Sequence, residues 1–191
     1  MSNTQTQPEF IAFHGQICLQ RGGLLEVAEQ IHAFNSTHPE ELVHCFDLSS
    51  GRLIDLPLAG SWPETETWIN EHLAWALPKP AGRGRPKLGV VSREITLLPR
   101  QWQWLNEQPG GASATLRKLV DTAARDPQTE RRGAQDATYR LANAIAGDLP
   151  GYEEAMRALY APDQEAFRQI IGQWPEDVTS AVQQLAEPIW Q

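Results

Sequence analysis

Apolar and polar positions along residues 10–56 follow two different periodicities. Two apolar runs, 10–13 and 16–20, are separated by His14-Gly15, and two more, 42–48 and 52–56, are separated by Ser49-Ser50-Gly51. Short runs of this kind around glycine turns predict two β-hairpins. Between the hairpins, Leu24–Asn35 carries apolar residues at helical spacing. The sequence therefore predicts a ββαββ unit.

Most of the remaining periodic stretches indicate helices. Glu64–Leu77 has acidic residues in its first turn and apolar residues at helical spacing, and Pro78 ends it. After residue 126, glycine and proline breaks separate four amphipathic stretches. These stretches predict a small C-terminal helical bundle formed by Arg132–Ile145, Tyr152–Tyr160, Asp163–Gly172 and Glu176–Ala186.

The middle of the chain predicts one strand followed by a helix. Residues 91–98 alternate between two faces, and Ile95 and Leu97 place apolar side chains on one of them. Pro99 stands where the first turn of a helix tolerates proline. Trp102 and Leu105, three residues apart, predict the buried stripe of this helix.

A second helix is predicted after the break at Gln108–Gly111. Ser113 is expected to cap its start. One face of this helix is apolar, while Arg117, Lys118 and Arg125 point elsewhere. The apolar face consists of Leu116, Leu119, Val120 and Ala123.

These elements indicate the α+β class with four sections. An N-terminal α/β domain is expected over residues 1–77 and a Gly/Pro linker arm over 78–89. A strand-helix-helix unit is expected over 90–125 and a C-terminal helical domain over 126–191.

Charge is distributed unevenly along the chain, whose 191 residues carry a net charge of −8. Residues 1–78 hold two basic and ten acidic residues, residues 79–125 nine and three, and residues 126–191 five and eleven. Nearby charges dominate because the Debye length at physiological salt is about 8 Å. The basic middle section therefore favours local binding of a polyanion.

The centre of the linker arm, Gly82–Lys87, reads Gly-Arg-Gly-Arg-Pro-Lys. Its glycines and prolines favour an extended backbone, and it lacks side chains that build a core. It resembles the AT-hook, whose Arg-Gly-Arg-Pro centre lies along the narrow minor groove of A·T-rich DNA. The resemblance implies DNA contacts by Arg83, Arg85 and Lys87, and the alternative is a solvated basic linker.

The strand and two helices resemble the ribbon-helix-helix family of the Arc, MetJ and CopG type. The resemblance rests on the predicted strand Arg93–Leu97, the Leu98-Pro99 junction, Trp102 with Leu105, and the run from Gly111 to Val120.

In that family two chains pair their strands into an antiparallel ribbon that enters the major groove, and the second helix binds phosphate at its start. The resemblance thus implies a homodimer with a central ribbon-helix-helix. It implies further DNA contacts by Ser92, Arg93, Glu94, Thr96, Arg100 and Ser113. It implies dimer contacts by Val91, Ile95, Leu97, Trp102, Leu105, Leu116, Leu119 and Val120.

The charges of Arg93 and Glu94 leave the register of the ribbon open. On the base-reading face, Glu94 accepts only from cytosine and repels phosphate. A register shifted by one residue points Arg93 outward instead. In the other alternative, the ribbon serves assembly and does not read DNA.

The chemistry of the sequence favours a binding protein over an enzyme. It contains no nucleophile elbow, phosphate loop, dinucleotide fingerprint or zinc-ligand spacing, so neither a cofactor nor a metal site is predicted. Cys18 and Cys45 predict buried reduced thiols, the alternative being a metal site with His14 and His44. The whole chain also resembles an uncharacterised bacterial family of unknown function, which implies no activity.

Location and function complete the predictions. No apolar run approaches the roughly 18–20 residues of a membrane span, and the N-terminus lacks a secretory signal, so a cytoplasmic protein without membrane contact is expected. The favoured function is that of a dimeric DNA-binding protein, a transcriptional regulator that uses the arm and the ribbon-helix-helix. The alternatives are a homodimeric adaptor whose ribbon serves assembly only and a small-molecule sensor with an unknown effector.

Overall fold

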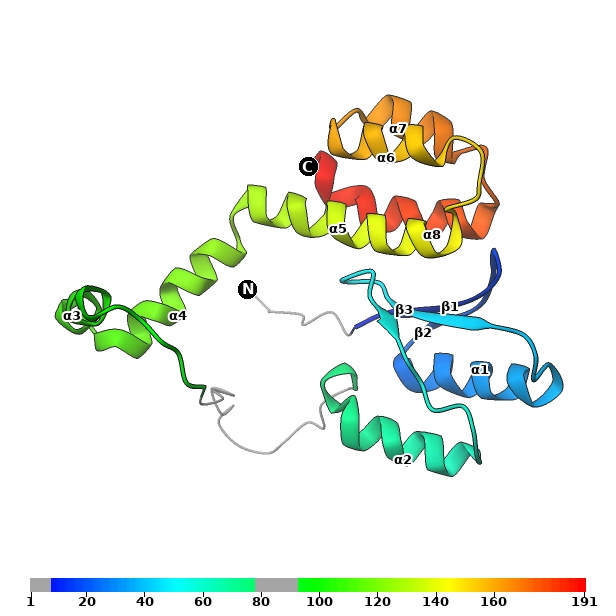
Figure 1. Cartoon of the computed structure of the whole chain (residues 1–191), viewed down its shortest axis with the longest axis horizontal. Coiled ribbons are helices and arrows are strands. Elements are labelled where there is room, and N and C mark those ends of the chain that lie inside the picture. The colour runs from blue at the N-terminus through cyan, green and yellow to red at the C-terminus, as the bar shows by residue number, and fades with distance from the viewer. Residues whose placement is uncertain (1–7, 78–92) are drawn as a thin grey trace, which may run out of the picture. The chain divides into compact units, whose positions relative to one another are not determined.

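The computed structural model describes residues 8–77 and 93–191 (Figure 1). Within these residues it contains one four-stranded antiparallel sheet and eight α-helices, so the predicted α+β class is confirmed. The chain divides into two compact units. We call them the core unit, Met1–Pro78 with Arg131–Gln191, and the middle unit, Lys79–Glu130.

The sheet of the core unit has the strand order β2-β1-β3-β4. Each neighbouring pair is antiparallel, and a register shift at Ala12/Phe13 marks a bulge between β1 and β2. The predicted turn at Ser49–Gly51 lies between two paired strands. The first turn falls at Gly15-Gln16, one residue later than predicted, and His14 is the last residue of the first strand. The strands are β1 (Phe10–His14), β2 (Ile17–Gly22), β3 (Val43–Asp47) and β4 (Leu53–Ile54).

The central strand β1 is buried on both faces. Ile11 and Phe13 belong to a cluster with buried residues of the C-terminal helices, whereas Phe10 and Ala12 belong to a cluster with the helices that follow the first hairpin. Successive side chains of a strand point to opposite faces. The uninterrupted apolar run Phe10–Phe13 therefore places this strand between two layers of helices.

The first helical layer consists of α1 (Leu24–Thr37) and α2 (Trp62–His72), followed by a short 3-10 helix over Ala74–Ala76. Four residues at the predicted spacing, 24, 27, 28 and 31, are buried in α1. The start of α2 precedes the predicted one because Ser61 and Glu64 form a capping box, in which the Glu64 carboxylate accepts from the Ser61 amide at 2.7 Å.

The second layer contains the C-terminal helices. Three of them have bounds within one residue of those predicted, whereas the first begins at Pro127 and not at Arg132. Their apolar faces share one cluster with Phe46 and Leu48 of the sheet side, so this section packs on the sheet and does not form a separate core. No helix in the described part of the chain is long and apolar enough to cross a membrane. The elements are α5 (Pro127–Ile145), α6 (Tyr152–Tyr160), α7 (Gln164–Ile171), α8 (Glu176–Ala186) and a 3-10 helix over Glu187–Trp190.

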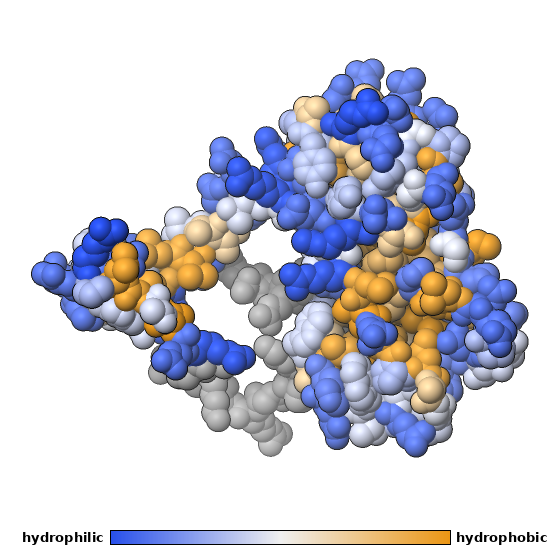
Figure 2. All heavy atoms as spheres, in the orientation of Figure 1, coloured by the Kyte–Doolittle hydropathy of each residue, from blue (hydrophilic) through white to orange (hydrophobic). Residues whose placement is uncertain are grey.

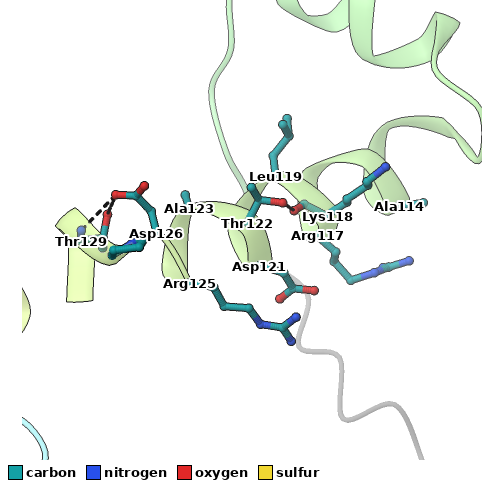
Figure 3. Close-up of a pocket in the computed structure, with 11 residues that line it drawn as sticks. Ala114, Arg117, Lys118, Leu119, Asp121, Thr122, Ala123, Arg125, Asp126 and Thr129 are labelled. Carbon is teal, nitrogen blue, oxygen red and sulfur yellow. Dashed lines mark hydrogen bonds between the residues drawn. The ribbon is translucent and has the colours of Figure 1, made fainter. Parts of the chain in front are cut away.

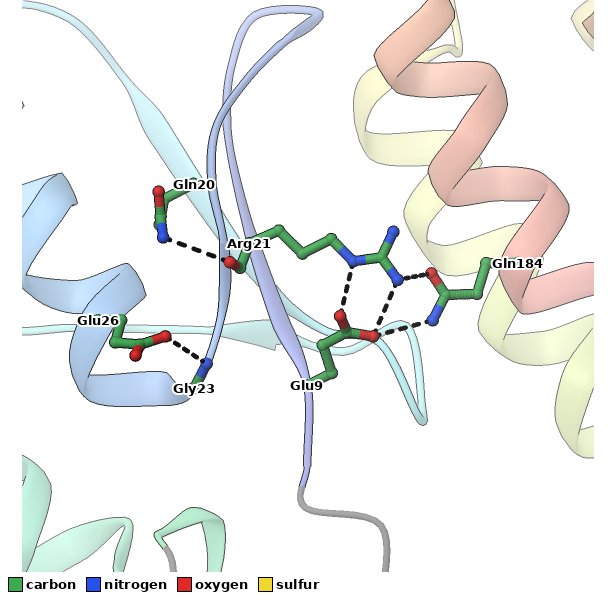
Figure 4. Close-up of polar contacts among 6 residues, drawn as sticks. All are labelled: Glu9, Gln20, Arg21, Gly23, Glu26 and Gln184. Atoms are coloured by element: carbon green, nitrogen blue, oxygen red, sulfur yellow. Dashed lines mark hydrogen bonds and ion pairs between the residues drawn. The ribbon is translucent and has the colours of Figure 1, made fainter.

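Polar contacts join the sheet to α8 (Figure 4). Arg21 of β2 donates to both carboxylate oxygens of Glu9, at 2.8 and 2.9 Å, and also to the amide oxygen of Gln184. Gln184 in turn donates to Glu9 at 3.1 Å. The hydrogen bonds from Arg21 lower the pKa of Glu9, against a smaller opposing effect of burial.

Asp47 stabilises the turn between β3 and β4. This buried carboxylate accepts from the Ser49 amide at 2.8 Å and from the Ser50 hydroxyl at 2.6 Å. Gly51 has φ +64° and lies against the Ala137 carbonyl of α5. A side chain at Gly51 would collide with that backbone, which explains why the turn ends in glycine.

Candidate functional site

The middle unit contains two helices, α3 (Pro99–Glu107) and α4 (Gly111–Ala124). A short turn joins them, and we call the pair the α3–α4 hairpin. Pro99 lies in the first turn of α3 as predicted, and the Gln101 side chain accepts from the Leu98 amide at 2.8 Å. Gly110 has φ +89° and is the N-cap of α4. Because glycine adopts this conformation freely, α4 begins before Ser113, and the predicted capping role of Ser113 is wrong.

The predicted strand Arg93–Leu97 does not form within the described residues 93–98. A strand is stabilised by hydrogen bonds to a neighbouring strand, and the described part of the middle unit offers only helices beside this segment. Ile95 is exposed and Leu97 is half-buried. Within residues 8–77 and 93–191, this alternating segment therefore pairs with no strand.

The apolar face of α4 is left largely uncovered. No residue of α4 is buried by the described part of the chain, and Leu119 and Val120 are 48% and 63% exposed. Apolar side chains along this helix are visible in Figure 2. In α3, one residue of the predicted buried stripe, Leu105, is buried, whereas the other, Trp102, is 37% exposed. Large exposed apolar patches are common at protein interaction sites.

An apolar groove of about 400 Å³ runs between α3 and α4. Its apolar lining includes Leu97, Trp104 and Leu116, and Arg100 and Gln101 contribute the polar groups. This volume falls in the range of about 300–1,000 Å³ that is common for binding pockets. The groove is therefore large enough to receive side chains or a small ligand.

The polar face of α4, together with the C-cap residue Arg125, carries three cations and one carboxylate (Figure 3). Arg117, Asp121 and Arg125 extend from one side of the helix, whereas Leu119 points away from them. A groove of about 1180 Å³ is lined by these residues and by the start of α5. At that start, Asp126 accepts from the amides of Gln128 and Thr129, at 3.1 Å each.

The predicted DNA contacts are placed in two groups. Arg83, Arg85, Lys87 and Ser92, with the dimer residue Val91, lie outside the described residues. Arg93, Glu94, Thr96, Arg100 and Ser113 are all exposed on the middle unit. None of the middle unit's described cations forms an ion pair with another described residue. The sequence did not assign a DNA role to Arg117, Lys118 or Arg125, although their spacing in one helix was visible.

Reactive groups of the core unit are held in their neutral forms. Burial raises the pKa of the Cys45 thiol to about 12 and also raises that of Cys18. Burial, with the neighbouring Tyr139, raises the pKa of Tyr152 to about 12. His14, part of the alternative metal site, instead contacts Glu41 at 2.8 Å. These thiols and this phenol are therefore not ionised near neutral pH.

Comparison with known proteins identifies the family. Residues 9–186 match DUF2239, which is described as an uncharacterized protein conserved in bacteria. The chain belongs to the DUF2239 family. The match confirms the predicted likeness to an uncharacterised bacterial family, and the DUF2239 region includes both the core unit and the middle unit. No curated protein and no solved structure matches the chain significantly.

Proposed function

We propose that the chain is a homodimeric DNA-binding protein, a regulator of transcription whose middle unit serves both assembly and DNA binding. One observation carries this proposal. The α3–α4 hairpin combines an uncovered apolar face, at Leu119 and Val120, with exposed and unpaired cations within the described residues. The apolar face favours contact with another protein surface. The cations favour binding of a polyanion.

In this proposal a second copy completes the central ribbon-helix-helix. The segment Arg93–Leu97 pairs with the same segment of the other chain, which supplies the missing backbone hydrogen bonds. The apolar faces of the two α4 helices pack together, and this packing buries Leu119 and Ile95, which are exposed in the single chain. An isologous pairing of this kind buries on both chains what a single hairpin cannot bury alone.

The arm supplies the DNA contact that is independent of the ribbon register. Arg83, Arg85 and Lys87 belong to an AT-hook-like sequence, and such arginines enter the narrow minor groove of A·T-rich DNA, where the negative potential is strongest. The charge distribution supports this role. The middle unit holds nine basic and five acidic residues, whereas the core unit holds seven and nineteen.

The proposal is tested by titrating a fluorescently labelled A·T-rich duplex with the full chain at several salt concentrations. Affinity should fall steeply with salt, as counterion release requires. The double variant Arg83→Ala/Arg85→Ala should weaken binding at least tenfold, and Arg52→Ala/Arg157→Ala in the core unit is the charge-matched control. Lack of binding at low salt, or equal losses in the two double variants, would contradict the proposal.

A second candidate is a homodimeric adaptor whose hairpin serves assembly only. The exposed carboxylate of Glu94 beside the exposed Arg93 favours it, because this carboxylate repels phosphate wherever the ribbon approaches DNA. The adaptor predicts a dimer in sedimentation velocity together with no salt-dependent affinity for duplex DNA. The two measurements therefore separate the candidates.

A further inference from the structure

The two faces of α4 are chemically opposed, and the apolar face is assigned to assembly in the proposed function. Its residues 116, 119, 120 and 123 follow the spacing of one helix face. Arg117, Asp121 and Arg125 follow one another at intervals of four residues on the other side (Figure 3). A helix turns once in 3.6 residues, so this interval keeps the three side chains in line.

The polar face is a basic strip. Arg117, Lys118 and Arg125 are exposed, and none of them forms an ion pair with any residue in 8–77 or 93–191. Asp121 is the one carboxylate of α4, so the four charges sum to +2. The strip lines part of a groove of about 1180 Å³ that continues to the start of α5, and Leu119 and Ala123 of the apolar face line the same groove.

We propose that Arg117, Lys118 and Arg125 bind the phosphate backbone of duplex DNA. This inference rests on the proposed function. It adds a DNA-contacting surface to those of the ribbon and the arm. Dimerisation through the apolar face turns the opposite face of α4 outward, where a long polyanion can reach it. The strip positions DNA without reading its sequence, because phosphate contacts carry no base information.

The dimensions of the strip suit a phosphate backbone. Arg117 and Arg125 are eight residues apart, which corresponds to about 12 Å along a helix axis. Phosphates of one DNA strand advance by about 3.4 Å each along the duplex, so the strip spans three to four of them. A planar guanidinium at each end forms bidentate hydrogen bonds with phosphate oxygens.

Asp121 lies between the two arginines and opposes the approach of phosphate. Its carboxylate repels the backbone and moderates the affinity of the strip. Replacing it by asparagine removes the repulsion and keeps the size of the side chain. The variant Asp121→Asn should therefore bind DNA about two- to threefold more tightly.

The test measures duplex affinity of the full chain across salt concentrations from about 50 to about 200 mM. The variant Arg117→Gln/Arg125→Gln should bind duplex DNA about tenfold more weakly near 0.1 M salt. The slope of log K against log salt should also be smaller in magnitude by about 1.8, because each of the two lost phosphate contacts contributes about 0.9. Glutamine preserves helix propensity. The control Arg52→Gln/Arg157→Gln removes the same charge from the core unit and should change affinity less than twofold.

The outcomes separate the inference from the function on which it rests. If the wild-type chain does not bind duplex DNA at low salt, or binds only vesicles of anionic lipid, both are overturned. If the wild type binds and Arg83→Ala/Arg85→Ala weakens it while Arg117→Gln/Arg125→Gln does not, only the strip is overturned. An unchanged affinity of Asp121→Asn, with normal circular dichroism, also overturns the strip.

Discussion

The core unit and the middle unit differ in what they bury. In the core unit a sheet is covered on both faces, and side chains such as Phe13, Phe46 and Leu159 have no exposed surface or almost none. In the described part of the middle unit, only Leu105 is a buried apolar residue. Burial of apolar surface is the main source of stability. The core unit therefore stabilises the fold, while the described part of the middle unit leaves most of its apolar side chains exposed.

The largest expected difference concerns truncation of a buried leucine in each unit. Leu159→Ala in α6 leaves a cavity in the shared core and should lower the free energy of unfolding by about 2–5 kcal/mol. Leu105→Ala in α3 should leave the main transition of the core unit unchanged. Urea denaturation followed by circular dichroism measures both. Equal losses in the two variants would contradict independent roles of the units.

The next largest effect concerns self-association. Leu119→Asp/Val120→Asp places two carboxylates on the exposed apolar face of α4 and should weaken dimerisation at least 100-fold in sedimentation velocity. Leu42→Asp changes a leucine of the core unit that is also exposed, at 68%, and is the control. A dimer that persists in the double variant, or dissociates in the control, would show that α4 is not the interface.

Much of the core unit could be predicted from the sequence because its signals are local. The bounds of α6 and α8 agree with the apolar spacing and with the glycine and proline breaks. The packing of these helices on the sheet could not be predicted, since it depends on contacts between distant segments. The run Phe10–Phe13 predicted a strand of a hairpin but not which helices would cover each of its faces.

The middle unit was predicted less well, for two physical reasons. The strand Arg93–Leu97 was inferred from alternation, but alternation does not supply the partner strand that backbone hydrogen bonds require. The start of α4 was assigned to Ser113 because serine is a common cap, whereas the left-handed conformation of Gly110 decides it. The basic strip could have been found from the interval of four between Arg117, Asp121 and Arg125.

A moderate difference is expected between two aspartates that cap helices. Asp163 accepts from the Ala166 amide at 3.1 Å and begins α7 in the core unit, so Asp163→Ala should cost about 1 kcal/mol of stability. Asp126 forms similar bonds at the start of α5, but the residues that follow it are exposed up to Gly133. Asp126→Ala should therefore fray this turn and lower the free energy of unfolding by less than about 0.5 kcal/mol. A larger loss for Asp126→Ala would show that the turn supports the core unit.

The smallest expected effect is a pH dependence confined to the core unit, at the contact between Glu9 and Arg21. The hydrogen bonds from Arg21 lower the pKa of Glu9 below the ordinary value of 4.5. A carboxylate with a lowered pKa stabilises the folded state above that ordinary value, and the stabilisation disappears as the pH falls through the lower, folded value. Because the two side chains are 40% and 37% exposed, the contribution should stay below about 1 kcal/mol.

The pH dependence is measured from urea midpoints at about pH 6 and about pH 3. The wild type should lose more stability between these values than Glu9→Gln, which cannot titrate at this position. Arg21→Gln should reduce the loss in the same way, because the arginine causes the shift, and high salt should reduce it only partly, since hydrogen bonds persist when charges are screened. Equal losses of stability in the wild type and both variants would show that protonation of Glu9 does not weaken the contact between the sheet and α8.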